Sequence, residues 1–282
     1  MRILTFDIED WFHILDFDET ENLDDWNKYN TRIQLGLDFI LSALSASGYK
    51  ATFFILGWIA EKYPAVIRKI ISAGYEIGCH SYSHLLIYKH SPAKVKSDLE
   101  YSVKLLEDVT GNKIKYFRAP GFSITKDSNW AFDIFVELGF EVDSSIFPTT
   151  RGHGGYLDFP YSTPCNLDIK GSLIKELPIN ILKFMGKEIV FSGGGYFRIL
   201  PYSIQKTLYN KSDYVMTYFH PRDFDYEQPV LNNLSRARKF KSYVGLKGSR
   251  NKFNKLLNDF KFVDIKTAVS QIDWQKVPTV KL

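Results

Sequence analysis

The feature that most constrains this fold is an alternation of short apolar runs with longer segments of helical period. β-Branched and aromatic residues fill seven short runs, which we expect to be strands at residues 2–6, 51–56, 75–78, 116–119, 140–143, 174–177 and 214–219. Apolar residues at three- and four-residue spacing predict helices at 33–46, 65–73, 92–109 and 130–138. The pattern predicts an α/β fold, a distorted (β/α) barrel of about seven parallel strands with its active site at the C-terminal strand ends.

Glycine and proline separate these units. Gly48, Gly74 and Gly111 follow three predicted helices, and Pro92 stands in the first turn of another. Residues 147–171 and 192–196 show no period, so we expect both to be loops. Residues 221–282 are predicted to be a basic helical extension with a last strand at 262–265, packed on a single domain that spans residues 1–282.

The composition is that of a folded protein with a small positive charge. Apolar residues make up 45% and charged residues 24% of the 282 residues, far from the composition of disordered chains. The net charge of +4 is partly concentrated between Arg236 and Lys261. Such a run usually forms a solvated helix face, and an anionic lipid surface or a phosphate-bearing substrate is the alternative. No zinc finger, helix-turn-helix or ribonucleoprotein motif accompanies it, so a nucleic-acid partner is not expected.

The cysteines and the N-terminus bear on the compartment. Cys79 and Cys165 have no paired spacing, so we expect reduced thiols rather than a disulfide. Asp7 lies where a signal peptide would need its apolar stretch. The sequence also contains no run of about 18 apolar residues, the length that a membrane-spanning helix needs. These features predict a cytoplasmic protein without a transmembrane segment, and they leave the oligomeric state open.

Three carboxylates follow the first predicted strand, at Asp7, Glu9 and Asp10. Alternate residues of a strand share a face, so Asp7 and Glu9 would point to one site, whereas Asp10 would reach it only if the chain turned. For this segment alone, solvated acids at a strand end are an equally good interpretation.

Two histidines, His80 and His84, stand four residues apart just beyond the third predicted strand. On one turn of helix this spacing aligns both imidazoles toward one ion, although such a pair often arises on a surface by chance. The position at a strand end favours a metal. Two imidazoles and one carboxylate leave a fourth coordination position open, which is typical of catalytic rather than structural zinc.

Two further strand ends carry polar residues. Arg118 can pair with a carboxylate, and the Pro-Gly turn after it can aim backbone N–H groups at an oxyanion; a structural arginine in a turn is the alternative. His220 ends the seventh predicted strand, where it is either a general acid or a satisfied core histidine. We interpret His13 and His153 as candidate substrate contacts and His90 as a surface residue.

Taken in order, these segments resemble the polysaccharide deacetylase family, also called carbohydrate esterase family 4 or the NodB homology group. The first family motif, a catalytic Asp with an acidic metal ligand, is matched by Asp7 with Glu9 or Asp10. The second, a His-x-x-x-His pair, is matched by His80 and His84. The common pattern has two adjacent aspartates where this chain reads Asp-Ile-Glu-Asp, so the acidic ligand stays open, and strand parity favours Glu9.

The remaining motifs also occur in order. The third, Arg-x-Pro with an aromatic residue, is matched by Arg118, Pro120 and Phe122, and the fifth, which supplies the catalytic histidine, by His220. Asp143 is the match for the fourth-motif acid that tunes this histidine. The glycine-rich loop at 193–198 and the basic tail look like the branch linked to exopolysaccharide and surface-glycan biosynthesis.

The resemblance implies an enzyme with a divalent metal, for which we expect zinc. It implies that Asp7 is the base, that Arg118 orients it, and that His220 is the acid. We expect Gly121, Phe122 and Tyr196 to bind the substrate.

The implied reaction is hydrolysis of the N-acetyl group of an amino sugar, in a surface polysaccharide or in its nucleotide- or lipid-linked precursor. The alternatives are hydrolysis of another linear or cyclic amide C–N bond and a non-catalytic glycan-binding module. Retention of both His80 and His84 together with Asp7 and His220 argues against the module.

Overall fold

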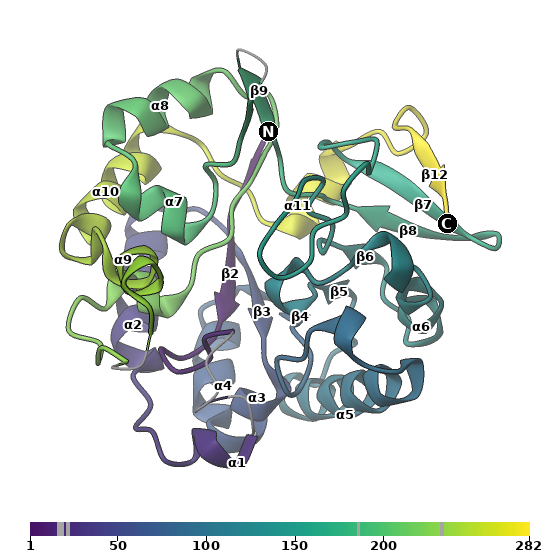
Figure 1. Cartoon of the computed structure of the whole chain (residues 1–282), viewed down its shortest axis with the longest axis horizontal. Helices are drawn as coiled ribbons and strands as arrows, with labels where there is room; N and C mark the ends of the chain where they lie inside the picture. Colours follow the sequence, from purple (N-terminus) through teal and green to yellow (C-terminus); the bar gives the residue numbers. More distant parts are fainter. Residues whose placement is uncertain (16–19, 21–22, 185–186, 232–233) are drawn as a thin grey trace.

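Parallel strands form the centre of the protein, as the alternation predicts (Figure 1). The structure is a computed structural model that describes residues 1–15, 20, 23–184, 187–231 and 234–282. In these residues the parallel strands lie side by side in the order β11 (Val215–Met216), β1 (Arg2–Ile3) continued by β2 (Thr5–Ile8), β3 (Thr52–Ile55), β4 (Glu76–Cys79), β5 (Tyr116–Phe117), β6 (Val142–Asp143) and β8 (Ser172–Glu176). Each of them overlaps an expected run, which confirms the α/β fold with a mostly parallel sheet.

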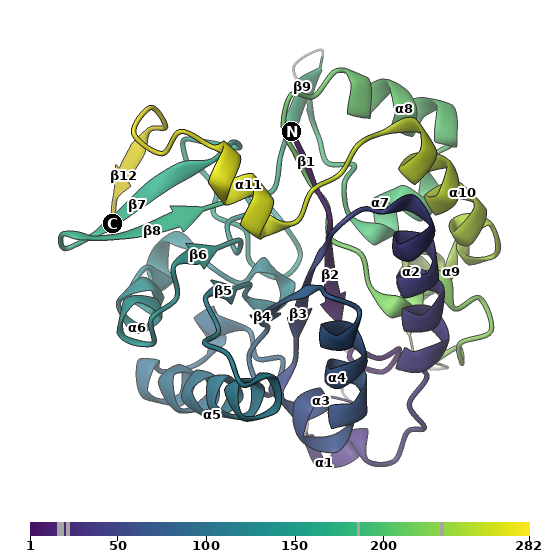
Figure 2. The ribbon, with the colours of Figure 1, turned by 180° about the vertical axis from the view of Figure 1, so that it is seen from behind.

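One edge of the sheet carries an antiparallel hairpin (Figure 2). β7 (Cys165–Ile169) pairs antiparallel with β8, and β12 (Thr279–Lys281) adds parallel to β7. The expectation of a loop over 147–171 is wrong for this last part, where apolar and polar residues alternate with the period of a strand. Lys170 and Gly171 have φ values of 53° and 93°, as a two-residue hairpin turn requires. A second hairpin joins β9 (Leu182–Phe184) and β10 (Lys187–Ile189).

Helices pack in two groups. One group contains α3 (Gly57–Lys62), α4 (Pro64–Ser72), α5 (Pro92–Thr110) and α6 (Ala131–Glu137), and the other contains α2 (Ile33–Ser47), α7 (Gly194–Ile199), α8 (Tyr202–Asn210) and α10 (Leu246–Asp259). The predicted helices α2, α4, α5 and α6 are confirmed. Gly48 and Gly111 end α2 and α5 in the left-handed region, with φ values of 71° and 68°.

The last part of the chain differs from its prediction. It forms α9 (Arg236–Tyr243), α10, α11 (Ile265–Gln271) and β12. The strand expected at 262–265 is wrong, because only Val263 bridges to Ile3 and the Asp264 side chain caps α11 by accepting from Thr267 N at 2.8 Å. Among the described helices, none is long and apolar enough to cross a membrane.

Aromatic rings fill the interface between the sheet and α10. The ring centroids of Phe6 and Phe53 are 5.1 Å apart and those of Phe219 and Phe253 5.5 Å apart, and all four side chains are fully buried. Both cysteines are buried and free, which agrees with the expected reduced thiols. The high aromatic content therefore serves the core on this side of the sheet.

A buried pair of carboxyl groups lies on neighbouring strands β6 and β8. Asp143 accepts hydrogen bonds from Ser145 N at 3.0 Å and Ser145 Oγ at 2.6 Å, so it has the partners that an ionised carboxylate needs. Burial, together with the negative charge of Asp143, raises the pKa of Glu176 well above its usual value. Oε2 of Glu176 is buried and has no hydrogen-bond partner. If Glu176 kept its proton, this oxygen could donate it in a hydrogen bond to the Asp143 carboxylate.

We expect Glu176→Gln to stabilise the protein increasingly as the pH rises. The unfolded chain loses this proton above the ordinary pKa of 4.5, whereas the folded protein keeps it, so folding becomes less favourable as the pH rises through that window. Glutamine keeps the shape and a donor toward Asp143 but binds no proton. The gain in free energy of unfolding should grow by up to about 1.4 kcal/mol per pH unit, as measured by urea denaturation at acidic and neutral pH. A gain that does not change with pH would contradict the retained proton.

Candidate active site

Two acids from the end of β2 face one histidine. Asp7 lies in β2 and Glu9 just beyond it, and His220 Nε2 is 3.9 Å from Asp7 Oδ2 and 4.0 Å from Glu9 Oε1. Both carboxylates are buried. Strand parity therefore predicted correctly that Asp7 and Glu9 share a face.

Glu9 also meets the two histidines that follow β4. Its Oε1 lies 3.0 Å from His80 Nε2 and 2.9 Å from His84 Nε2. One ligand atom from each of the three residues lies within 4.8 Å of the others, and all three side chains are buried. The His-x-x-x-His spacing and the acid thus converge as predicted.

The protonation of His80 is set by its second nitrogen. His80 Nδ1 lies 2.7 Å from the carbonyl oxygen of Arg118, which can only accept, so Nδ1 carries a proton. In a neutral imidazole Nε2 then presents a lone pair to the Glu9 carboxylate, and such a contact is favourable only with a proton or a cation between the two atoms. The donor set of two nitrogens and one oxygen fits a divalent transition metal.

The expected helical turn at 80–84 is wrong. The segment is a bend in which Ser81 and His84 adopt positive φ values of 62° and 55°. Residues other than glycine rarely adopt this conformation, and it is found mainly where surrounding contacts hold it, often at functional sites. The two left-handed residues turn the chain so that both imidazoles face Glu9.

Asp98 in α5 holds this bend, and our sequence reasoning missed it. Its carboxylate accepts from Tyr82 N at 2.8 Å, from Ser83 N at 3.1 Å and from the Ser83 hydroxyl. These bonds replace those of a helical turn. The signal in the sequence was an acid on the inner face of an amphipathic helix, where an apolar residue is the rule.

Asp10 does not join the cluster. Its Oδ1 accepts from Trp11 N at 2.8 Å, and its Oδ2 accepts from Arg32 N at 3.1 Å, next to the start of α2. Its own N–H donates to His13 Nδ1 at 3.0 Å. Asp10 is therefore not supported as the acidic metal ligand, because its carboxylate orders the turn after β2.

Arg118 fixes Asp7 from the neighbouring strand end. It is fully buried, and its Nη1 donates to Asp7 Oδ1 and to Thr5 Oγ1, both at 2.7 Å. Nη2 donates to Ser144 Oγ at 3.0 Å, and the guanidinium carbon lies 4.3 Å from the centre of the Phe54 ring. These contacts fix the position of the guanidinium and of the carboxylate that it orients.

His220 is oriented by Asp223 rather than by Asp143. His220 Nδ1 lies 3.1 Å from Asp223 Oδ2, and the His220 N–H donates to the same oxygen at 2.9 Å. Asp143 instead accepts from Ser145, so its predicted role as the tuning acid is wrong. Burial lowers the pKa of His220, but the charges of Glu9 and Asp223 outweigh it and raise the pKa to about 8.

The glycine-rich segment before this site is a helix start, not the expected loop. A Cβ on Gly193 would lie 2.0 Å from the Tyr218 ring, and one on Gly194 would lie 1.8 Å from Asp223 Oδ2. The glycines therefore let α7 approach the strand end and the carboxylate closely. Tyr196, predicted to bind substrate, lies on α7 with 45% of its surface exposed.

Phe122 also lies near the Arg118 guanidinium. Its ring centre is 5.5 Å from the guanidinium carbon, and Phe122 N already donates to Ala119 O at 3.0 Å. This N–H is therefore not the free oxyanion donor that the sequence suggested. Gly121 has a φ of 61°, and a Cβ there would lie 2.7 Å from Leu15 Cδ1, so the turn needs glycine.

The other histidines differ in their surroundings. His13 is buried, with its ring centre 4.2 Å from that of Trp26 and 5.4 Å from that of Trp58, and burial lowers its pKa well below the usual value. It lies next to the cluster, since its ring centre is 6.3 Å from that of His84. His153 is buried beside Gly121, and His90 is exposed as predicted.

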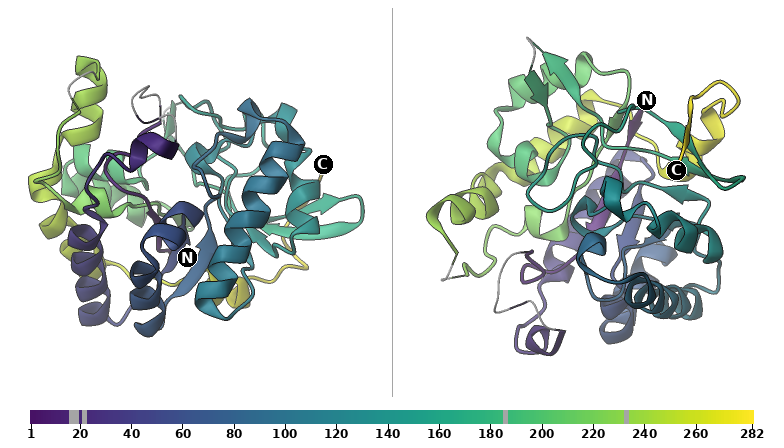
Figure 3. Two further views of the ribbon diagram at one scale, coloured as in Figure 1. Left: turned by 90° about the horizontal axis from the view of Figure 1, so that it is seen from below. Right: turned by 45° about the vertical axis from the view of Figure 1, so that its right-hand side comes forward.

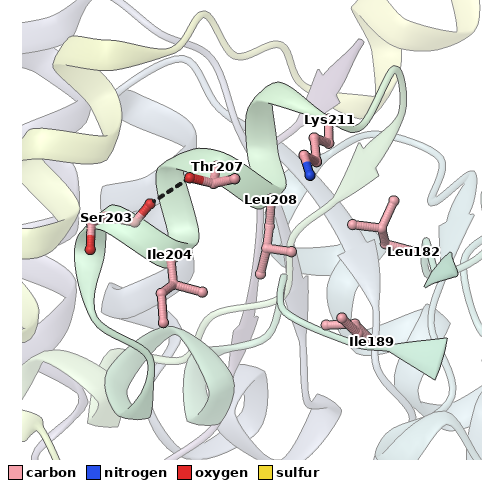
Figure 4. A pocket seen from close by; sticks show the side chains of 7 residues that line it. All are labelled: Leu182, Ile189, Ser203, Ile204, Thr207, Leu208 and Lys211. Carbon is pink, nitrogen blue, oxygen red and sulfur yellow. Dashed lines mark hydrogen bonds between the residues drawn. The ribbon is translucent and has the colours of Figure 1, made fainter. Parts of the chain in front are cut away.

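A separate apolar pocket lies away from this cluster. It has a volume of about 360 Å³, lies between α8 and the β9–β10 hairpin, and shares no residue with the cluster (Figure 4). Its lining is mainly aliphatic and consists of Leu182, Ile189, Ser203, Ile204, Thr207, Leu208 and Lys211. No acid or imidazole reaches it, so it offers none of the chemistry of the strand ends.

Two family models match this chain. Residues 27–141 match the model described as polysaccharide deacetylase. Within the chain, the similarity to polysaccharide deacetylases thus covers residues 27–141. Residues 144–270 match a second model, described as a domain of unknown function, DUF3473. The resemblance drawn from the motifs is thus confirmed for the segment that holds His80, His84 and Arg118.

The curated relatives include proteins that are named deacetylases. A peptidoglycan-N-acetylglucosamine deacetylase of Bacillus cereus is 33% identical over 107 residues, which are 37% of this chain and 39% of the relative. The matched part is less than two thirds of the length of the curated relatives.

Solved structures show the fold over almost the whole chain. A Mycobacterium smegmatis protein assigned to the polysaccharide deacetylases has a TM-score of 0.66 at 18% identity, over 99% of this chain and 92% of that chain. A Bacillus anthracis protein described as a CE4 family pseudoenzyme has a TM-score of 0.50 at 12% identity, over 99% of this chain and 66% of that chain. The fold alone therefore does not decide whether this chain is an active enzyme, because that depends on the residues of the site.

We expect Asp223→Asn to lower the pKa of His220, because it removes a charge that raises this pKa. Asp143→Asn should leave the pKa unchanged. NMR titration of the imidazole in chelator-treated protein measures both variants. Equal shifts in the two variants would refute the assignment of Asp223 as the partner.

Proposed function

We propose that this chain is a metal-dependent hydrolase that removes the acetyl group from an N-acetylated sugar. One observation carries the proposal: Glu9 Oε1 lies within 4.0 Å of the Nε2 atoms of three histidines, His80, His84 and His220. Asp7 lies beside them, held by Arg118. Amide hydrolysis needs such a set, in which a base, an acid and a cation site surround one reacting bond.

His80, His84 and Glu9 would hold the ion. The facing lone pairs of these buried groups favour a cation among them, and two imidazoles with one carboxylate leave a coordination position open. When bound there, a divalent cation supplies Lewis-acid polarisation of the acetamide carbonyl and lowers the pKa of a water. We expect zinc, because imidazole nitrogens suit it and the site offers no sulfur ligand.

The neighbouring residues of the chain move the protons. Asp7, ionised and oriented by the Arg118 guanidinium, accepts a proton from the attacking water. Burial raises the pKa of Asp223, but the hydrogen bond from His220 and the charge of Arg198 outweigh it and lower the pKa to about 2. Asp223 thus stays charged and keeps the imidazolium of His220 protonated, so that His220 can protonate the departing amine nitrogen. Acetate and a free amino sugar result.

The second matched segment supplies part of this machinery. His220 and Asp223 lie in residues 144–270, while His80, His84 and Arg118 lie in the deacetylase match. We therefore propose that both segments form one catalytic domain over residues 1–282. On this view the DUF3473 segment contributes the acid of the reaction.

The substrate is proposed on chemical grounds. The name of the Bacillus cereus relative supports N-acetylglucosamine or a similar N-acetylated amino sugar as the acetyl carrier. We propose a surface glycan of the exopolysaccharide type, or its nucleotide- or lipid-linked precursor. A cytoplasmic precursor is the version that agrees with the compartment expected from the sequence.

We expect acetate release from N-acetylated amino sugars to require a metal. A chelator should abolish turnover, and added zinc should restore it. Asp7→Asn should lower kcat by at least about 1,000-fold while the protein keeps its bound metal, since the carboxylate acts as a base and not as a ligand. His80→Ala should lose the metal. Acetate assays with metal analysis measure each effect, and an Asp7→Asn variant that loses the metal and regains its rate in excess zinc would make Asp7 a ligand instead of the base.

We expect substitutions of the two acids after β2, Glu9 and Asp10, to differ in their effect on metal affinity. Glu9→Gln should weaken metal affinity on the order of 100-fold or more, because a charged ligand is lost. Asp10→Asn should keep the affinity and change the free energy of unfolding by less than about 1 kcal/mol, since the asparagine oxygen can still accept from Arg32 N. Calorimetric zinc titration and urea denaturation distinguish the two effects. Loss of zinc binding in Asp10→Asn alone would make Asp10 the ligand.

A further inference from the structure

Helix α9 differs from the other helices in that it buries none of its side chains. Figures 1 and 3 show it at the margin of the molecule. A surface helix of a folded protein normally buries one apolar stripe against the core, whereas α9 packs only the partly buried Tyr243 against it. Its outer face is thus left without a partner within the described part of the chain.

The helix stands in a strongly cationic segment. Between Gln228 and Asn258 the sequence contains eight Lys and Arg residues and no acidic residue. Half of these cations lie in α9 itself, whose sequence is RARKFKSY. A partner for this face must therefore carry negative charge.

Some cations of the segment are used within the protein. Arg238 donates to Leu15 O at 2.8 Å, Arg250 to Phe224 O at 2.7 Å, and Lys252 to main-chain carbonyls at the end of α7. These three hold the segment on the body of the protein.

The other three cations of α9 have no ion-pair partner among the described residues. The side chains of Arg236, Lys239 and Lys241 form no ion pair with any residue that the structure describes. Arg236 and Lys241 are exposed, and Lys239 is partly exposed. The charge of this face is therefore available to an outside partner.

An aromatic ring stands among these cations. Phe240 is 60% exposed, lies one helical turn after Arg236, and is flanked by Lys239 and Lys241 in the sequence. An exposed phenylalanine loses the free energy that its burial would provide. Cationic side chains around an exposed aromatic ring are the composition of helices that lie in the headgroup layer of a membrane.

The helix is built into the protein rather than loosely appended. Ser235 caps its start by accepting from Arg238 N at 3.3 Å. At its other end, Arg198 donates to the carbonyl oxygens of Ser242 at 3.0 Å and Val244 at 2.9 Å, and its Nε donates to Asp223 Oδ1 at 2.9 Å. A surface that held α9 would thus lie close to the partner of His220.

We propose that the outer face of α9 binds an anionic lipid surface. Three flexible cations match a layer of lipid phosphates, and Phe240 inserts between the headgroups. A nucleic-acid site is less well matched, since the face has one aromatic ring where stacking of successive bases needs several. The binding does not depend on the deacetylase reaction, and it would bring the active site to substrates displayed at a membrane.

The test uses the whole chain and lipid vesicles without any sugar. The protein is sedimented with vesicles of pure phosphatidylcholine and with vesicles in which one third of the lipid is phosphatidylglycerol. We expect binding only to the anionic vesicles, and we expect it to weaken as the salt concentration rises. The variant Arg236→Gln, Lys239→Gln, Lys241→Gln should bind about a hundredfold more weakly, at about fivefold for each cation. Phe240→Ser should weaken binding severalfold.

A matched control removes three charges elsewhere. Lys62, Arg68 and Lys94 lie on α3, α4 and α5, are exposed and form no ion pair with a described residue, so their change to Gln gives the same net charge. This control should bind like the natural chain, and thermal unfolding shows that each variant is folded. The proposal is overturned if the two triple variants bind equally or if the natural chain does not bind anionic vesicles. It is also overturned if the natural chain binds a single-stranded oligonucleotide as tightly as it binds the vesicles.

Discussion

The active site depends on one buried contact, between the Arg118 guanidinium and the Asp7 carboxylate. The same residue acts through its main chain, because its carbonyl oxygen accepts from His80 Nδ1 and so turns the Nε2 lone pair toward Glu9. One side chain and one carbonyl of Arg118 thus position both the proposed base, Asp7, and a proposed metal ligand, His80. Removal of one partner of a buried ion pair typically costs about 3 to 5 kcal/mol, so this position links stability and chemistry.

Parallel topology explains why these residues meet. β2, β4, β5 and β11 all run in one direction, and Asp7, His80, Arg118 and His220 lie at or just beyond their C-terminal ends. Residues that are up to 213 positions apart therefore reach one edge of the sheet, the edge at which α/β enzymes build their active sites.

Periodicity correctly predicted which side chains share a face of a strand, but it did not predict the conformation of the connecting segments. The two-residue period of a strand correctly placed Glu9 beside Asp7 and left Asp10 behind. The four-residue spacing of His80 and His84 predicted their convergence but not the bend that achieves it, because that bend depends on Asp98, which lies 14 positions after His84. The loop predicted at 192–196 begins a helix for a related reason. Its glycines are needed because the side chains of Tyr218 and Asp223, which are distant in the sequence, leave no room for a Cβ there. Spacing within a segment carries no information about such contacts.

The partner of His220 shows the same limit and has a structural consequence. An acid on β6, such as Asp143, would make the orientation of His220 depend on the sheet. Asp223 stands three residues after His220, in the short turn η5 (Pro221–Phe224) that His220 precedes, so a local contact orients the histidine instead. That turn needs a close neighbour, and Gly36 in α2 provides it, because a Cβ there would lie 2.0 Å from Pro221 O. The orientation of the proposed acid is therefore set by helix packing around a glycine. Asp143 instead lies in the core, where burial and the charge of Asp143 raise the pKa of Glu176.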